Sequence, residues 1–204
     1  MPNDESSPIV LVAGASGVIG RRFLPELVAH GYSVLGLTRS RSNAQVIERL
    51  GATALVCDVY DAPALGAAFE NYAPGIVVDL LTDLPDEADR IPRFADANNR
   101  MRTIGTDNLL GAAARAGAER VIAESVAWEL PGNGALAVEH LENAVLSARG
   151  VVLRYGQLWG EGTYHLVRPS AGPTLSVVEA GRLTMQFLGA EPGIYELVDQ
   201  PFRP

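Results

Sequence analysis

A glycine-rich turn between an apolar run and a helical pattern constrains this chain more than any other stretch. The run Val10–Ala13 leads into glycines at positions 14, 17 and 20. Gly14 can adopt the positive φ that ends a strand sharply, Gly17 has no Cβ to keep a phosphate from the backbone, and Gly20 lets a helix pack closely. The next apolar residues recur at helical spacing: Val18, Ile19, Phe23, Leu24, Leu27 and Val28. Because a helix N-terminus attracts anions, the pattern predicts a nucleotide-binding loop, with a purely structural turn as the alternative.

Composition narrows the class of protein. A chain of 204 residues that is 48% hydrophobic and has no linker-like stretch predicts one domain over residues 1–204. A net charge of -8 without a basic stripe argues against nucleic acid, and the absence of a long apolar run argues against a membrane partner. Residues 1–8 lack the features of a signal peptide, so a cytoplasmic location is expected. No metal site is predicted, and Cys57, the only cysteine, is expected to be a buried structural thiol.

Strand-like and helix-like segments alternate along the chain. After Val10–Ala13 the predicted strands are Ser33–Thr38, Thr53–Cys57, Gly75–Thr82, Val121–Ser125, Gly150–Arg154 and Ile194–Val198. The later predicted helices are Ala44–Leu50, a helix from about Asp61 to Tyr72, Pro92–Ala116, Asn133–Ala148 and Val177–Leu188, and residues 155–163 are expected to be irregular. This order predicts an α/β fold with a doubly wound parallel sheet of the Rossmann type, its last strand at the sheet edge.

Polar residues follow several of the predicted strands. Ligands of such sheets bind beyond the carboxyl ends of the strands. Arg39 follows the second strand, where an arginine accommodates the 2′-phosphate of NADP, so NADP is favoured and NAD is the alternative cofactor. A solvated loop arginine is the other interpretation of Arg39. Asp58, after the third strand, can accept a hydrogen bond from adenine or can form a turn or cap.

With these motifs assembled, the chain resembles the extended and atypical short-chain dehydrogenase/reductases, which include the NAD-dependent epimerase/dehydratases and the NmrA-like proteins. The similarity covers the Gly14-x-x-Gly17-x-x-Gly20 spacing, the pair Asp58–Val59, residues 105–121 and residues 153–163. It implies a small-molecule substrate and a homodimer formed through the helices predicted at 92–116 and 133–148. The cofactor-binding residues that it implies are Gly14, Ser16, Gly17, Val18, Ile19, Gly20, Arg39, Asp58, Val59, Leu80 and Leu81.

The chain departs from this family in its proton relay. The family uses a serine or threonine after the fifth strand and a Tyr-x-x-x-Lys pair on the next helix. All 16 basic residues here are arginine, and residues 129–153 contain no tyrosine. The replacement candidates, each with a structural alternative, are Tyr155, His140, Glu124 and Ser125, and Asp79 and Asp83 are expected at the same rim.

Two classes of function remain open from the sequence. The first is an NAD(P)-binding oxidoreductase, epimerase/dehydratase or non-redox isomerase or cyclase that acts on a small organic substrate. The second is a non-catalytic NmrA-like regulatory or scaffold protein, which the loss of tyrosine and lysine would permit. The family's substrate-binding lobe is expected to be reduced here to about residues 156–204.

Overall fold

A parallel seven-stranded sheet forms the centre of the computed structural model, which describes residues 8–85 and 87–199. The order of the strands is β3-β2-β1-β4-β5-β6-β9. Their bounds are β1 Val10–Ala13, β2 Val34–Thr38, β3 Thr53–Val56, β4 Ile76–Asp79, β5 Arg120–Val126, β6 Val151–Tyr155 and β9 Gly193–Leu197. The predicted Rossmann-type sheet is confirmed, and so is the edge position of the last strand. The order of the strands reverses between β1 and β4, which is where such sheets open a crevice for ligands.

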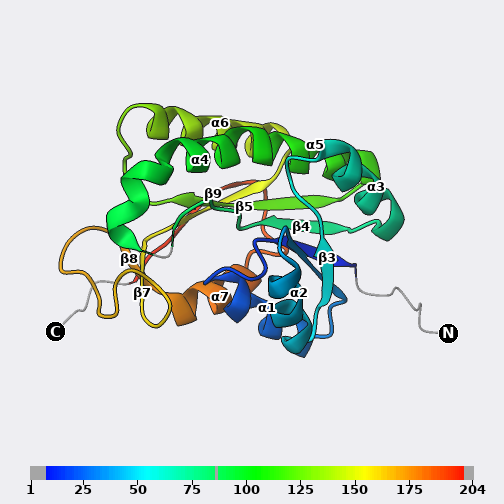
Figure 1. The fold of residues 1–204 in the computed structure, drawn as a ribbon, viewed down its shortest axis with the longest axis horizontal. Coiled ribbons are helices and arrows are strands. Elements are labelled where there is room, and N and C mark those ends of the chain that lie inside the picture. The colour runs from blue at the N-terminus through cyan, green and yellow to red at the C-terminus, as the bar shows by residue number, and fades with distance from the viewer. Residues whose placement is uncertain (1–7, 86, 200–204) are drawn as a thin grey trace.

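Helices cover both faces of the sheet (Figure 1). The face with α1, α2 and α7 lies below the sheet in this view, and the face with α4, α5 and α6 lies above it. The helices are α1 Gly20–Ala29, α2 Arg41–Arg49, α3 Ala62–Tyr72, α4 Ala95–Arg100, α5 Thr106–Ala116, α6 Asn133–Ser147 and α7 Val177–Met185. Within the described residues, none of the helices is both long and apolar enough to cross a membrane.

The alternation of side chains along the strands builds a core on each face. Val10 and Val12 of β1 belong to the cluster around Phe23 and Leu27 of α1, whereas Leu11 belongs to the cluster on the opposite face. Successive side chains of a strand point to opposite faces, so a strand covered on both faces is apolar throughout. This explains why β1 and most of β4 read as unbroken apolar runs.

The stretch predicted as helical from about Pro92 to Ala116 is helical throughout, but it is not one regular α-helix. The segment is divided into a 3₁₀ helix η1 (Ala88–Phe94), α4, a π-helical turn η2 (Met101–Gly105) and α5. Pro92 lies inside η1, and a proline cannot donate the backbone hydrogen bond that a regular helix interior needs. In η2, a Cβ at Gly105 would lie 2.8 Å from Sδ of Met101, at the flexible end of that side chain.

Three smaller expectations are also corrected. Helix α2 begins at Arg41 instead of Ala44, because the Ser40 hydroxyl accepts a hydrogen bond from the Asn43 N–H and caps the helix. The segment after β6 is irregular only in part, since β7 (Gln157–Trp159) pairs in parallel with β8 (Thr174–Ser176). Cys57 is only partly buried, and burial together with the charges of Asp61 and Asp58 raises the pKa of its thiol.

Candidate functional site

The three glycines of the first turn have different tasks. Gly14 has φ +79°, and a Cβ there would collide with the carbonyl oxygen of Leu80. A Cβ at Gly20 would lie 2.5 Å from the carbonyl oxygen of Gly14, so the fold itself requires both glycines. Gly17 is exposed, and a Cβ there would meet only the carbonyl oxygen of Gly14, at 3.1 Å. The outer side of Gly17 is therefore open for a ligand to approach the backbone.

Free backbone donors cluster at the start of α1. The N–H groups of Val18, Ile19 and Gly20 have no hydrogen-bond acceptor among residues 8–85 and 87–199. Arg21 Nε donates to the carbonyl oxygen of Ser16 at 2.6 Å and lies against the same turn. Free N–H groups and the positive end of a helix are what a pyrophosphate binds. The turn therefore fits the phosphates of a dinucleotide.

The ends of β2, β3 and β4 bring the other expected cofactor residues to the same edge. Arg39, after β2, forms an ion pair with Asp83, whose Oδ1 lies 3.0 Å from Arg39 Nη2. Asp58 is exposed, and its Oδ1 accepts the N–H of Tyr60 at 2.9 Å, which is an Asx turn. Val59 is buried, as is Leu80 after β4, whereas Leu81 is half-buried. Only the exposed members of this set can make polar contacts with a ligand without rearrangement.

A group of charged side chains lies at the carboxyl ends of β4 and β5. Burial raises the pKa of Glu124 on β5 to about 8. The positive charge of Arg102 lowers this pKa, and the negative charge of Asp79 raises it further. Burial likewise raises the pKa of Asp79 to about 6, although its carboxylate accepts hydrogen bonds from the Leu81 N–H at 3.0 Å and the Thr106 hydroxyl at 3.4 Å. Glu124 is therefore mostly protonated at neutral pH and able to donate a proton.

Ser125 faces the other side of β5 and is held in a structural network. Its hydroxyl donates to Oε1 of Glu142 on α6 at 2.6 Å. The same carboxylate accepts two hydrogen bonds from Arg154 on β6, at 2.8 and 2.6 Å. Burial opposes ionisation of Glu142, but the hydrogen bonds from Arg154 and Ser125 outweigh it and lower the pKa. The Ser125 hydroxyl is thus engaged away from Glu124.

Tyr155 and His140 also lie apart from this carboxyl group. The side chain of Tyr155 is 2% exposed, and its hydroxyl lies 2.7 Å from the Thr184 hydroxyl on α7. Burial raises the pKa of Tyr155 far above its ordinary value. His140 is an exposed residue of α6 whose Nε2 lies 2.9 Å from Oδ1 of Asp107 on α5. Tyr155 is thus a core residue, and His140 is a surface residue.

Sequence reasoning missed Arg102 and Glu142. Arg102 lies in the π-helical turn, which the apolar spacing did not reveal. Glu142 had an indirect signal, because Arg154 interrupts an otherwise apolar strand and implies a buried partner of opposite charge.

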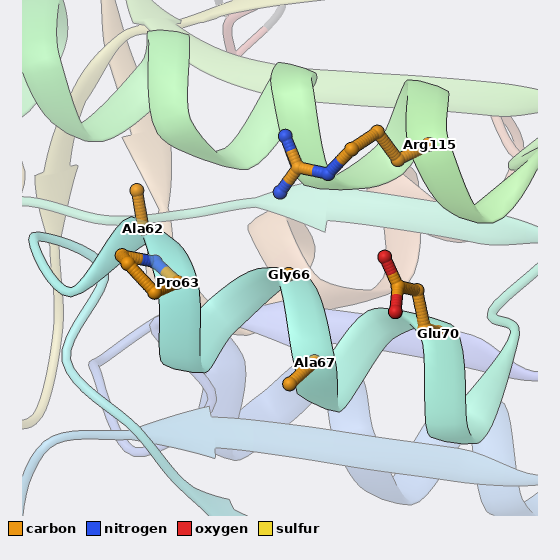
Figure 2. Close-up of a pocket in the computed structure, with 6 residues that line it drawn as sticks. All are labelled: Ala62, Pro63, Gly66, Ala67, Glu70 and Arg115. Carbon is orange, nitrogen blue, oxygen red and sulfur yellow. The ribbon is translucent and has the colours of Figure 1, made fainter.

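Two hollows lie outside the glycine turn. One, of about 610 Å³, is walled by α6, by the chain after β5 and by the edge of β6 and β9, and its charged lining residues are Glu129, Glu139, Glu142, Arg154 and Glu196. The other, of about 440 Å³, lies between α3 and α5, where the Arg115 side chain extends toward α3 near Gly66 (Figure 2). This second hollow contains none of the strand-end residues. Over residues 8–85 and 87–199, no three His, Cys, Asp or Glu side chains are grouped to hold a metal ion.

Comparison with known proteins identifies similar chains. The model of the NAD dependent epimerase/dehydratase family matches residues 10–142. A 3-diazoavenalumate denitrifying reductase from Streptomyces sp is 36% identical over 89% of this chain and 65% of its own length. Cinnamoyl-CoA reductase 1 from Oryza sativa subsp. japonica is 32% identical over 59% of this chain and 35% of its own length. The matches therefore span less than two thirds of these relatives.

Solved structures share the fold. UDP-glucose 4-epimerase from Thermotoga maritima, solved with UDP-glucose, gives a TM-score of 0.76 at 16% identity and covers 93% of this chain and 76% of that one. UDP-glucose 4-epimerase from Thermus thermophilus, solved with NAD, gives a TM-score of 0.71 at 20% identity. The match covers 93% of this chain and 77% of the epimerase chain. At these identities the similarity establishes the architecture alone.

The raised pKa values of Glu124 and Asp79 predict that stability falls as pH rises. Glu124 titrates near 4.5 when unfolded and near 8 when folded, so the folded state holds an extra proton between these values. The corresponding window for Asp79 is about 3.8 to 6. The free energy of unfolding should therefore decrease from pH 5 to pH 8.5, and Glu124→Gln should remove most of the decrease above pH 6.5.

Urea denaturation at a series of pH values measures this effect. Glu139→Gln changes an exposed glutamate of α6 and should leave the wild-type profile unaltered. Parallel profiles for the wild type and Glu124→Gln would contradict the assignment.

Proposed function

Because the chain belongs to the NAD dependent epimerase/dehydratase family, we propose that it binds a nicotinamide dinucleotide at the glycine turn and acts as a reductase of a small molecule. The observation that carries the proposal is the set of free N–H groups at Val18, Ile19 and Gly20, beside the open backbone of Gly17. These donors are suited to the pyrophosphate, and Arg39 is suited to the 2′-phosphate of NADP. NADP is accordingly the preferred cofactor in this proposal.

Glu124 takes the role of proton donor in the proposed reaction. When bound, a reduced nicotinamide supplies a hydride. Glu124 is protonated at neutral pH and lies at the carboxyl end of a central strand, where ligands of parallel sheets bind. Arg102 stabilises the carboxylate that remains after Glu124 has released its proton. A carboxylic acid thus replaces the tyrosine and lysine that the chain lacks.

The proposed substrate class is a small aromatic compound that carries a diazo group. The support is the 36% identity to a 3-diazoavenalumate denitrifying reductase, whose name describes the removal of nitrogen from a diazo compound. Reductive loss of nitrogen from a neutral diazo compound consumes one hydride and one proton. The carbon–nitrogen bond breaks, N₂ leaves, and the product gains both hydrogens. Glu124 delivers that proton and regains one from water.

Gly17→Val tests the binding step. A branched side chain there should occupy the space of the pyrophosphate and weaken NADPH and NADH binding at least about tenfold, with little effect on the fold. Isothermal titration calorimetry measures both affinities. Gly189→Val is the matched control, since no atom lies within 4 Å of a Cβ at Gly189. Indifference of the wild type to both nucleotides would reject dinucleotide binding.

Glu124→Gln tests the chemical step. With NADPH and an aryl diazo compound as substrates, wild-type kcat should fall as the pH rises above about 8, because Glu124 then loses its proton. General acid catalysis contributes about 100-fold or more, so kcat of the variant should drop by about that factor and lose its pH dependence. Glu139→Gln is the control. NADPH that binds but is not oxidised by diazo or carbonyl substrates would favour the non-catalytic, NmrA-like role instead.

We further propose that two copies pair through the face formed by α5 and α6. Large apolar side chains are exposed on this side of the molecule, with Leu136 of α6 63% exposed and Ile104 of η2 45% exposed. Light scattering at micromolar concentration should give about twice the chain mass of 21.6 kDa, and Leu136→Glu should shift the population toward the monomer. A monomer mass for the wild type would refute the pairing.

A further inference from the structure

The ion pair between Arg39 and Asp83 lies across the carboxyl end of β1, beside the glycine turn. Arg39 follows β2 and Asp83 lies beyond β4, and these two strands flank β1 in the sheet. The pair therefore bridges over the carboxyl end of β1, where the glycine turn starts. A group that binds Arg39 on the side of this ion pair meets the carboxylate of Asp83 as well.

The side chains of Arg39 and Asp83 differ in how far they are exposed to solvent. The Arg39 side chain is 60% exposed, whereas that of Asp83 is 18% exposed. The N–H of Asp83 also donates to Oδ1 of the buried Asn98 at 3.0 Å, which fixes the backbone at this residue. Asp83 is thus the anchored partner, and the arginine is held by it.

Positive and negative side chains surround Tyr60 in equal number. Tyr60 lies among Arg100, Asp83, Arg39 and Asp58, and burial is the main cause that raises the pKa of its phenol. The guanidinium of Arg100 lies 4.0 Å from the centre of the Tyr60 ring. The charged groups that act on the Tyr60 phenol are thus two arginines and two aspartates, whose charges balance. Removal of one carboxylate would leave this group positive, which would favour a phosphate with two negative charges.

We propose that Asp83 is a specificity-determining residue that restrains Arg39 and reduces the preference for a 2′-phosphorylated nucleotide. This inference rests on the proposed dinucleotide site. The carboxylate of Asp83 occupies Arg39 and repels a phosphate placed beside it. The same carboxylate can accept hydrogen bonds from the ribose hydroxyls of a nucleotide that lacks the 2′-phosphate. Asp83 in this way keeps NAD usable by a site that also contains an arginine for NADP.

Asp83→Asn tests the proposal, because asparagine keeps the size of the side chain and removes its charge. Calorimetric titrations would compare NADPH with NADH, and adenosine 2′,5′-bisphosphate with 5′-AMP as probes of the adenosine end alone. The variant should bind NADPH and the bisphosphate at least about fivefold more tightly, with NADH and 5′-AMP unchanged or weaker. Arg39→Ala in the Asp83→Asn background should abolish the gain. Asp89→Asn, which changes an exposed aspartate of η1, is the matched control.

The outcomes separate the possible failures. A ratio of NADPH to NADH affinity that stays within twofold of the wild-type ratio would overturn the role of Asp83 and leave dinucleotide binding intact. Weaker NADPH binding by Asp83→Asn would overturn it too, since it would mean that Asp83 positions Arg39 for the phosphate. Absence of binding by the wild type and every variant would overturn both this inference and the proposed function.

Discussion

The close approach of Gly14 to the backbone of Leu80 is the constraint on which the rest of the site depends. The N–H of Leu80 donates to the carbonyl oxygen of Ala13 at 2.9 Å, so the chain leaving β4 passes directly beside the glycine turn. A side chain at position 14 would collide with that chain. The buried carboxylate of Asp79 holds the next turn through the N–H of Leu81. The start of α1, and with it the direction of its free N–H groups, follows from this packing.

Two glutamates show how surroundings decide what a carboxyl group can do. Glu142 is buried, but Arg154 and Ser125 give it three hydrogen bonds, so it stays ionised and joins α6 to the sheet. Glu124 is partly buried, and among residues 8–85 and 87–199 the charge of Arg102 is what opposes its loss of hydration. A buried charge without enough hydrogen bonds takes up a proton. The first glutamate therefore stabilises the fold, and the second keeps an exchangeable proton near the carboxyl end of β5.

The sequence predicts the sheet well, because a doubly covered parallel strand must be apolar and the glycine spacing fixes the first turn. The burial of Tyr155 can be predicted in the same way. Tyr155 has the same parity as Val151 and Leu153 on its strand, and all three face one apolar core. The buried charges Arg102 and Glu142 were harder to predict, since their partners lie on other elements of the fold. Spacing along one helix carries no information about such contacts.

The π-helical turn η2 has a consequence for how this region can change in evolution. A π turn widens the helix by about one residue, so everything after it is rotated by roughly 100° about the axis relative to an unbroken α-helix. The deletion of a single residue there would restore the regular phase and turn Thr106 away from Asp79 while α4 kept its place. Insertions and deletions of one residue in 101–105 therefore change the direction in which the side chains of α5 point. Lineages that differ by one residue at this point can be expected to differ in which helical side chains face the carboxyl ends of the strands.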